Sequence, residues 1–266
     1  MKTTMTGAGL LAGALLLGGG AAQATLVNYT AGGVNLVYDQ DRNLTWAADA
    51  NLFQTQYTAD NTTVGKIIAA VPTVPDSLTG PHTVVAGDFD TGSGVMTWWG
   101  AMAWTQWLGS IGYGGASDWR LPATVQPDAT CEYQQNTGGF PPLGYGYNCT
   151  GSDLGHLFYT EGLLNPGDSI TASATLNQHF TNMQSFTYWS GTEVVSDLNA
   201  AWLFSTDRGI QGYDRKFFRG NLIDGWAVRP GQIADVPLPA TGLLMALGLL
   251  ALGATRRARR ATLVIR

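Results

Sequence analysis

The clearest pattern in the chain is the alternation of apolar and polar residues between positions 33 and 46. Val34, Leu36 and Tyr38 would lie on one face of a strand, because successive side chains of a strand point to opposite faces. A polar run at 39–43 interrupts the alternation, which then resumes. The pattern predicts a β-hairpin whose turn lies in that polar run.

Helical spacing replaces this alternation from Thr97 to Ile111. Ala101, Trp104, Leu108 and Ile111 recur three or four positions apart, which predicts a helix with that stripe buried. Thr97 is suited to cap its first turn. Shorter helices are predicted at 64–71 and 153–164, and a loop rich in Pro, Gly, Thr and Asp at 72–94.

The C-terminal third has the pattern of short strands separated by glycine-containing turns. The segments with this pattern are 187–190, 201–205, 216–218 and 226–229. A hairpin, then one or two helices, then an antiparallel meander predicts a compact single domain of the α+β class.

The segment 117–122, Ser-Asp-Trp-Arg-Leu-Pro, combines charge, an aromatic ring and a turn residue. Its proline disfavours helix, so the segment is expected to be extended. Asp118 and Arg120 would then share one face as an ion pair, while Trp119 points from the other face into the core. We therefore predict a structural corner; the alternative is an active-site role for Arg120.

The N-terminus has the three parts of a secretory signal peptide. Lys2 provides a short charged start, an apolar run follows at 8–17, and Ala22-Gln23-Ala24 matches a signal peptidase site. We expect cleavage after Ala24, which assigns residues 1–24 to the leader and exports the rest.

The C-terminus has a second composite segment at 236–260. A proline-rich motif is followed by an apolar run at 241–254 and by four arginines at 256, 257, 259 and 260. Such an arginine cluster would hold the end of a membrane-spanning helix on the cytoplasmic side, with the body outside. A plain single-span anchor is one interpretation.

This tail also resembles the PEP-CTERM sorting signal in its Val-Pro-Leu-Pro-Ala form. The resemblance implies recognition by an exosortase-type enzyme of a Gram-negative cell and removal of the helix near the motif. The protein would be membrane-anchored until processed, and would then reside at the cell surface or in the extracellular matrix with exopolysaccharide. The motif residues concerned are Val236, Pro237, Pro239 and Ala240.

The body between these ends, residues 25–235, has a length suited to one domain. It holds 19 acidic and 8 basic residues, a formal net charge of −11. Such a charge is a poor match for nucleic acid, and no nucleic-acid partner is expected.

Cys131 and Cys149 are the only cysteines of the chain. Two cysteines in an exported protein predict one disulfide, which would contribute about 3 kcal/mol by closing a short loop. The loop between them contains Tyr145 and Tyr147, which are candidates for a ligand-facing surface. The alternative is an irregular loop that the disulfide stabilises because it has no core of its own.

Two further groups of residues are candidates for binding. Trp98 and Trp99 lie partly off the helical stripe, where an indole could stack on a sugar, although packing in the core is the alternative. Asp39, Asp41 and Asn43 have the spacing of the first three ligands of a calcium loop. Leucine and alanine stand where such a loop has its glycine and final glutamate, so a solvated turn is the alternative and no cofactor is expected.

Five of the eight basic residues of the body fall between 208 and 229. Arginine side chains suit carboxylate and sulfate groups, which makes this edge a candidate site for acidic polysaccharide. The alternative is pairing with the interleaved Asp207, Asp214 and Asp224. The basic residues are Arg208, Arg215, Lys216, Arg219 and Arg229.

Several motifs in a fixed order resemble the Lcl C-terminal domain family. The resemblance implies a compact α+β domain on exported proteins and admits a C-type-lectin-like architecture, and it provides no catalytic motif. The matching segments are Asp41 with Leu44-Thr45-Trp46, Ser117–Pro122, Tyr188–Thr192, Ala201-Trp202 and Ala227–Arg229.

Three functions remain compatible with these observations. The favoured one is a non-catalytic module that binds glycan or exopolysaccharide at the cell surface. The others are a structural matrix protein without a discrete ligand and a polysaccharide hydrolase. Serine-hydrolase, zinc-protease and P-loop motifs do not occur in the sequence, which makes the hydrolase the weakest of the three.

Overall fold

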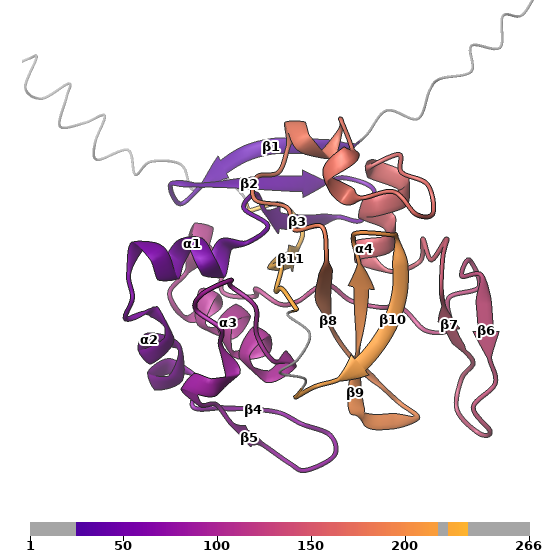
Figure 1. Cartoon of the computed structure of the whole chain (residues 1–266). Coiled ribbons are helices and arrows are strands. Elements are labelled where there is room, and N and C mark those ends of the chain that lie inside the picture. Colours follow the sequence, from indigo (N-terminus) through magenta and orange to yellow (C-terminus); the bar gives the residue numbers. More distant parts are fainter. Residues whose placement is uncertain (1–24, 218–222, 234–266) are drawn as a thin grey trace, which may run out of the picture.

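The computed structural model describes residues 25–217 and 223–233. An antiparallel sheet with the strand order β1-β2-β3-β11 carries the N-terminal hairpin (Figure 1). The β2–β3 hairpin confirms the predicted one, and it pairs Val37 with Trp46. The strands are β1 Leu26–Ala31, β2 Val34–Asp39, β3 Leu44–Ala47 and β11 Val228–Pro230.

Helices α1, α2 and α3 follow the hairpin and lie to one side of the two main sheets, whereas α4 lies apart from them (Figure 1). The hydroxyl of Thr97 accepts a hydrogen bond of 3.1 Å from the N–H of Gly100, which confirms the predicted cap. The prediction that Ile111 is buried was wrong, since this residue is 52% exposed just beyond the end of the helix. The helices are α1 Leu52–Ala59, α2 Thr63–Ala70, α3 Trp98–Ser110 and α4 Asp153–His156.

Short helical turns connect these elements. The predicted helix at 153–164 is only one α-helical turn, because α4 continues directly into a π-helical turn, η3 Leu157–Glu161. The 3₁₀ turns are η1 Ala86–Asp88, η2 Tyr113–Gly115, η4 Ile170–Ala172 and η5 Leu176–Gln178.

The C-terminal meander is a three-stranded antiparallel sheet with the order β10-β9-β8. Two predictions differ here: the strand expected at 216–218 ends at Arg215, and β11 pairs with β3 rather than with the meander. The meander strands are β8 Thr187–Val194, β9 Asp197–Ser205 and β10 Ile210–Arg215. Two small hairpins are formed by β4 Thr73–Val74 with β5 His82–Thr83, and by β6 Tyr133–Gln135 with β7 Leu143–Tyr145.

Buried tryptophans dominate the core. Trp104 and Trp189 pack with the helices in one cluster, whereas Trp46 and Trp226 pack in a second cluster beneath the first sheet. The rings of Trp46 and Trp226 meet edge to face with centroids 5.1 Å apart. Each such side chain buries a large apolar area, so these contacts fix the two sheets relative to each other.

The segment 117–122 places Trp119 in the core, but its ion pair differs from the predicted one. Trp119 is 4% exposed and lies in the core. Asp118 pairs with Arg229, at 2.7 Å from the carboxylate to Nε, rather than with Arg120. Arg120 instead lies 3.3 Å from Asp153. Asp118 and Arg120 therefore each pair with a residue of another element and not with each other.

Among the residues that the structure describes, no helix has the length and apolar character needed to cross a bilayer. The predicted leader, the sorting tail and the processing residues Ala24, Val236, Pro237, Pro239 and Ala240 lie outside the described residues.

Candidate functional site

A groove of about 620 Å³ lies beside the β1–β2 hairpin, where η2 and the segment that follows η5 approach it. Its walls combine amide, carboxylate, hydroxyl and imidazole groups with two tyrosines. We call this feature the hairpin groove. Its lining residues are Asn28, Tyr29, Thr30, Val34, Asn35, Leu36, Ala48, Asp49, Tyr113, His179 and Thr181.

Hydrogen bonds from strand β1 to the end of η5 and to the residue after it hold one wall of the hairpin groove. The amide of Asn28 donates to the carbonyl of Gln178 at 3.2 Å, and its oxygen lies 2.7 Å from Nδ1 of His179. Partial burial lowers the pKa of His179, which keeps its imidazole neutral near pH 7. This wall therefore presents uncharged polar groups.

The other wall is organised around the carboxylate of Asp49. It accepts hydrogen bonds from the N–H of Asn51 at 3.0 Å, the hydroxyl of Thr55 at 2.6 Å and the amide of Asn182 at 3.0 Å. Burial and the charge of Asp49 raise the pKa of Tyr113 to about 12, so its phenol stays neutral. A fixed carboxylate beside the neutral phenol of Tyr113 suits a neutral ligand rich in hydroxyl groups.

Trp98 and Lys216, both predicted to bind ligand, are buried. They are 2% and 1% exposed, and the ammonium of Lys216 lies 4.8 Å from the ring centre of Trp98. The same ammonium contacts Asp76 at 2.9 Å and also Glu193. Burial would raise the pKa of Asp76, but its hydrogen bond with Lys216 lowers it. The charged groups of this network are therefore paired with one another. Trp98 and Lys216 are therefore not exposed for ligand binding, in contrast to the prediction.

Trp99, the next residue of α3, is only half-buried. Its indole N–H donates to Asp76 at 2.9 Å, and its ring stacks on His82 with centroids 4.1 Å apart. His82 lies 3.1 Å from Asp88. One face of Trp99 is therefore already occupied by an imidazole, which leaves it a poor stacking platform for sugar.

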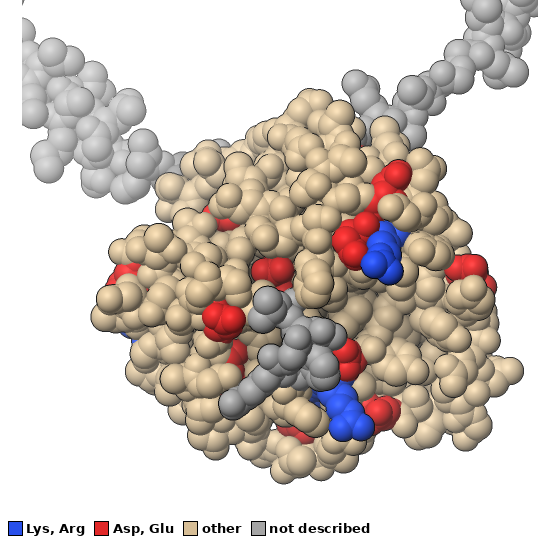
Figure 2. All heavy atoms as spheres, in the orientation of Figure 1, with Lys and Arg blue, Asp and Glu red and all other residues tan. Residues whose placement is uncertain are grey.

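The predicted basic edge is divided. Arg208 is exposed and pairs with Asp207 at 3.2 Å, while the guanidinium of Arg215 lies 5.9 Å from the ring centre of Phe217. Figure 2 shows basic atoms in small, separated patches beside carboxylates on this face. Arg219 lies outside the described residues. With Lys216 buried, the described part of this edge forms no continuous cationic surface.

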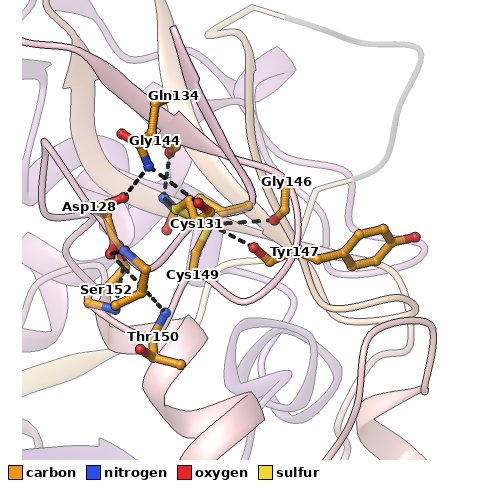
Figure 3. The surroundings of a disulfide bond; sticks show 12 residues. Asp128, Cys131, Gln134, Gly144, Gly146, Tyr147, Cys149, Thr150 and Ser152 are labelled. Carbon is orange, nitrogen blue, oxygen red and sulfur yellow. Dashed lines mark hydrogen bonds between the residues drawn. A yellow bond between two sulfur atoms is a disulfide. The ribbon is translucent and has the colours of Figure 1, made fainter.

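The disulfide between Cys131 and Cys149 is present, as predicted. Gln211 of β10 anchors the enclosed hairpin by donating to the carbonyl of Gly144 at 2.9 Å. The half-buried Tyr145 packs on Tyr133 with centroids 5.5 Å apart. Tyr147 points away from the disulfide (Figure 3). These rings form a small aromatic surface apart from the hairpin groove.

The residues of the predicted calcium loop point in different directions. Asp39 is fully buried and accepts the N–H of Arg42 at 3.0 Å, whereas Asp41 is exposed. Asn43 has a φ of 50° and accepts a hydrogen bond of 2.8 Å from the hydroxyl of Tyr38. The turn is therefore closed by hydrogen bonds, and the three oxygens do not surround one ion.

Asp39 instead belongs to a cluster that sequence reasoning missed, which we call the buried triad: Asp39, His156 and Glu161. Nε2 of His156 lies 3.4 Å from Oε1 of Glu161 and 3.7 Å from Oδ2 of Asp39. The residues come from the end of β2, from α4 and from η3. Asp39 is far from His156 and Glu161 in the sequence, so no local pattern joined the three residues.

The hairpin groove was also missed from the sequence. Its polar residues Asn28, Asn35, Asp49 and His179 come from distant segments and match no motif. The only usable signal was the hairpin itself, since a half-buried strand displays its polar positions on one side.

Comparison with known proteins places the chain in a family. The family model of the Lcl C-terminal domain matches residues 35–229, and the chain therefore belongs to that family. This confirms the resemblance inferred from its motifs. No curated protein and no solved structure shows significant similarity to the chain.

Proposed function

We propose that this member of the Lcl C-terminal domain family is an exported, non-catalytic module that binds glycan in the hairpin groove. The ligand class is a neutral segment of a polysaccharide, such as an exopolysaccharide of the cell's own matrix. The family is compatible with a protein of the cell surface or extracellular space.

The composition of the hairpin groove carries this proposal. Asn35 offers an exposed side-chain amide, and the amide of Asn28 and the carboxylate of Asp49 keep hydrogen-bonding capacity for sugar hydroxyls beyond their internal bonds. Tyr29 and Tyr113 offer apolar faces for the C–H surface of a sugar ring. The volume of about 620 Å³ lies within the range typical of small-ligand sites, so a short stretch of glycan fits.

The same composition disfavours the hydrolase alternative. Glycoside hydrolysis uses two carboxyl groups on opposite sides of the scissile bond, about 5–9.5 Å apart. Among the residues that line the hairpin groove, Asp49 is the single carboxylate. The groove lining therefore offers no second carboxyl group to complete such a pair.

Export and sorting complete the proposal. The leader ending at Ala24 would bring the body across the inner membrane, and the tail at 236–260 would hold it there until an exosortase-type enzyme acts. A body with a net charge of −11 would repel polyanions, which favours neutral glycans over acidic ones.

A glycan array probed with the purified full-length protein, with and without calcium, tests the proposal. We expect binding to a restricted set of neutral glycans that is independent of calcium. Uniform lack of binding would instead favour a structural matrix protein without a discrete ligand. Release of shorter sugars from a bound glycan would favour a hydrolase.

A further inference from the structure

The buried triad contains two polar atoms that have no hydrogen-bond partner among the described residues. They are Oδ2 of Asp39 and Nε2 of His156. Asp39 is fully buried, and only 8% of His156 is exposed. A buried polar atom left unsatisfied costs about 1–3 kcal/mol, and more when it is charged. Two such atoms facing each other indicate a site built around a partner.

The spacing of the triad matches the edges of a metal coordination tetrahedron. With metal–ligand distances near 2.0–2.1 Å, neighbouring ligand atoms of a tetrahedral ion lie about 3.3–3.4 Å apart. Nε2 of His156 lies 3.4 Å from Glu161 and 3.7 Å from Asp39. The three ligand atoms of the triad all lie within 4.8 Å of one another. One ion could contact all three with small side-chain adjustments.

The charges of the triad also call for a cation. Asp39 and Glu161 are 0% and 1% exposed, and two buried carboxylates so close repel each other. The nearby Arg42 directs its guanidinium to the carbonyl of Thr150 rather than into the triad.

We propose that the buried triad is a structural binding site for a divalent transition-metal ion of the zinc class. Oδ2 of Asp39, Nε2 of His156 and Oε1 of Glu161 are the three protein ligands. The imidazole nitrogen favours zinc over calcium and magnesium, which prefer oxygen ligands.

Thr25 is placed to complete or support this site. Its hydroxyl donates to Oε1 of Glu161 at 2.8 Å, and its backbone N–H donates to Oε2 at 2.9 Å. The hydroxyl, or a water beside it, is available as the fourth ligand. The second hydrogen bond orients the carboxylate, as outer partners of metal ligands commonly do. The ion would thereby fasten the start of β1 and the end of β2 to η3.

Zinc titration of the full-length protein, first freed of metal with EDTA, tests this inference. Calorimetry should show one zinc ion per chain and much weaker binding of magnesium. The melting temperature should rise by roughly 5–10 °C when free zinc is about 100 times its Kd. Cobalt in place of zinc should produce the strong visible absorption of a tetrahedral site.

Two variants and two matched controls make the test specific. Asp39→Asn and His156→Gln keep the side-chain volume and should each weaken zinc binding by roughly 100-fold or more. Asp41→Asn lies two positions from Asp39 but is exposed, and His82→Gln changes a histidine that lies beside Asp88, outside the triad and the hairpin groove, so both should bind zinc normally.

Two outcomes would overturn the inference. The first is the absence of a zinc-dependent shift in the unchanged protein. The second is a shift that persists in Asp39→Asn and His156→Gln. In either case the triad does not hold the ion.

Discussion

Arg229 donates two hydrogen bonds to Asp118, from Nε at 2.7 Å and from Nη2 at 3.0 Å. This pair joins the corner at 117–122 to strand β11, 111 residues further along the chain. Next to it, Arg120 and Val228 exchange two backbone hydrogen bonds of 2.8 Å. The corner thereby closes the first sheet at its β11 edge.

Asp118→Ala should destabilise the protein by only about 1 kcal/mol, because a half-exposed carboxylate is well solvated and its ion pair is screened. Its side chain is 46% exposed, and Arg229 keeps a hydrogen bond of 2.9 Å to the carbonyl of Gly231. Denaturant unfolding measures the change, with Asp41→Ala as the exposed control. A loss of several kcal/mol would show that the pair acts as a buried one.

Asp224 predicts an unusual dependence of stability on pH. Burial raises its pKa to about 7, and its Oδ1 has no hydrogen-bond partner among the described residues. The folded state therefore holds this proton at pH values where the unfolded chain has lost it, and stability falls as pH rises towards 7. Asp224→Asn should raise stability at pH 8 by no more than about 4 kcal/mol.

At acidic pH the stability of the protein depends on pH in the opposite sense, since it falls as pH falls. Asp76, Asp118, Glu161 and Glu193 have lowered pKa values, so their contribution is present above the unfolded-state pKa and is lost as pH falls through the folded-state values. Maximal stability is expected at about pH 4–5, where the two slopes cancel. Denaturant unfolding from pH 3 to 9 tests this, and a profile in Asp224→Asn with the wild-type slope above pH 5 would contradict it.

The disulfide should matter for stability more than for binding in the hairpin groove. Cys131 and Cys149 are 18 residues apart, and closing such a loop stabilises the fold by about 3 kcal/mol. The double variant Cys131→Ser/Cys149→Ser should lose about that amount and keep its glycan affinity. Mass spectrometry after thiol alkylation provides the control, since two alkylated cysteines without reductant would contradict the bond.

Cleavage after Ala24 would place the new α-amino group of Thr25 at the position of its backbone nitrogen, 2.9 Å from Oε2 of Glu161. A charged donor strengthens this bond, so protein starting at Thr25 should be about 1 kcal/mol more stable than protein with a short N-terminal extension. Both are compared in EDTA, to remove any metal.

The sign of this effect follows from the ammonium group. Glu161 raises its pKa in the folded state, so the added stability is present below the unfolded value of about 8 and is lost as pH rises through the folded value. Glu161→Gln should abolish the difference between the two forms. An extension that leaves stability unchanged at pH 6 would contradict the predicted pairing.

Local patterns in the sequence predicted the local structure well. The alternation before Asp39 predicted the hairpin, and Thr97 with the spaced Trp104 and Leu108 predicted α3. Trp119 lies in the core and the two cysteines are bonded, as expected. These features depend on neighbouring residues or on the only pairing available.

Long-range choices could not be predicted in this way. In the sequence, Arg120 and Arg229 are both possible ion-pair partners of Asp118. Only the tertiary structure selects Arg229. The sequence placed Lys216 in a basic edge, whereas the fold places it beside Asp76. The hairpin groove and the buried triad depend on the same kind of distant pairing, for which one sequence contains no periodic signal.

Affinity for the best array ligand tests glycan binding in the hairpin groove most directly. Asn28→Ala/Asn35→Ala removes two amides that line the groove, and Asn61→Ala removes an exposed amide outside the groove lining. Calorimetry on the full-length proteins should show roughly tenfold weaker binding for the double variant and unchanged binding for the control. Equal affinity in all three proteins would contradict the assignment of the groove as the binding site.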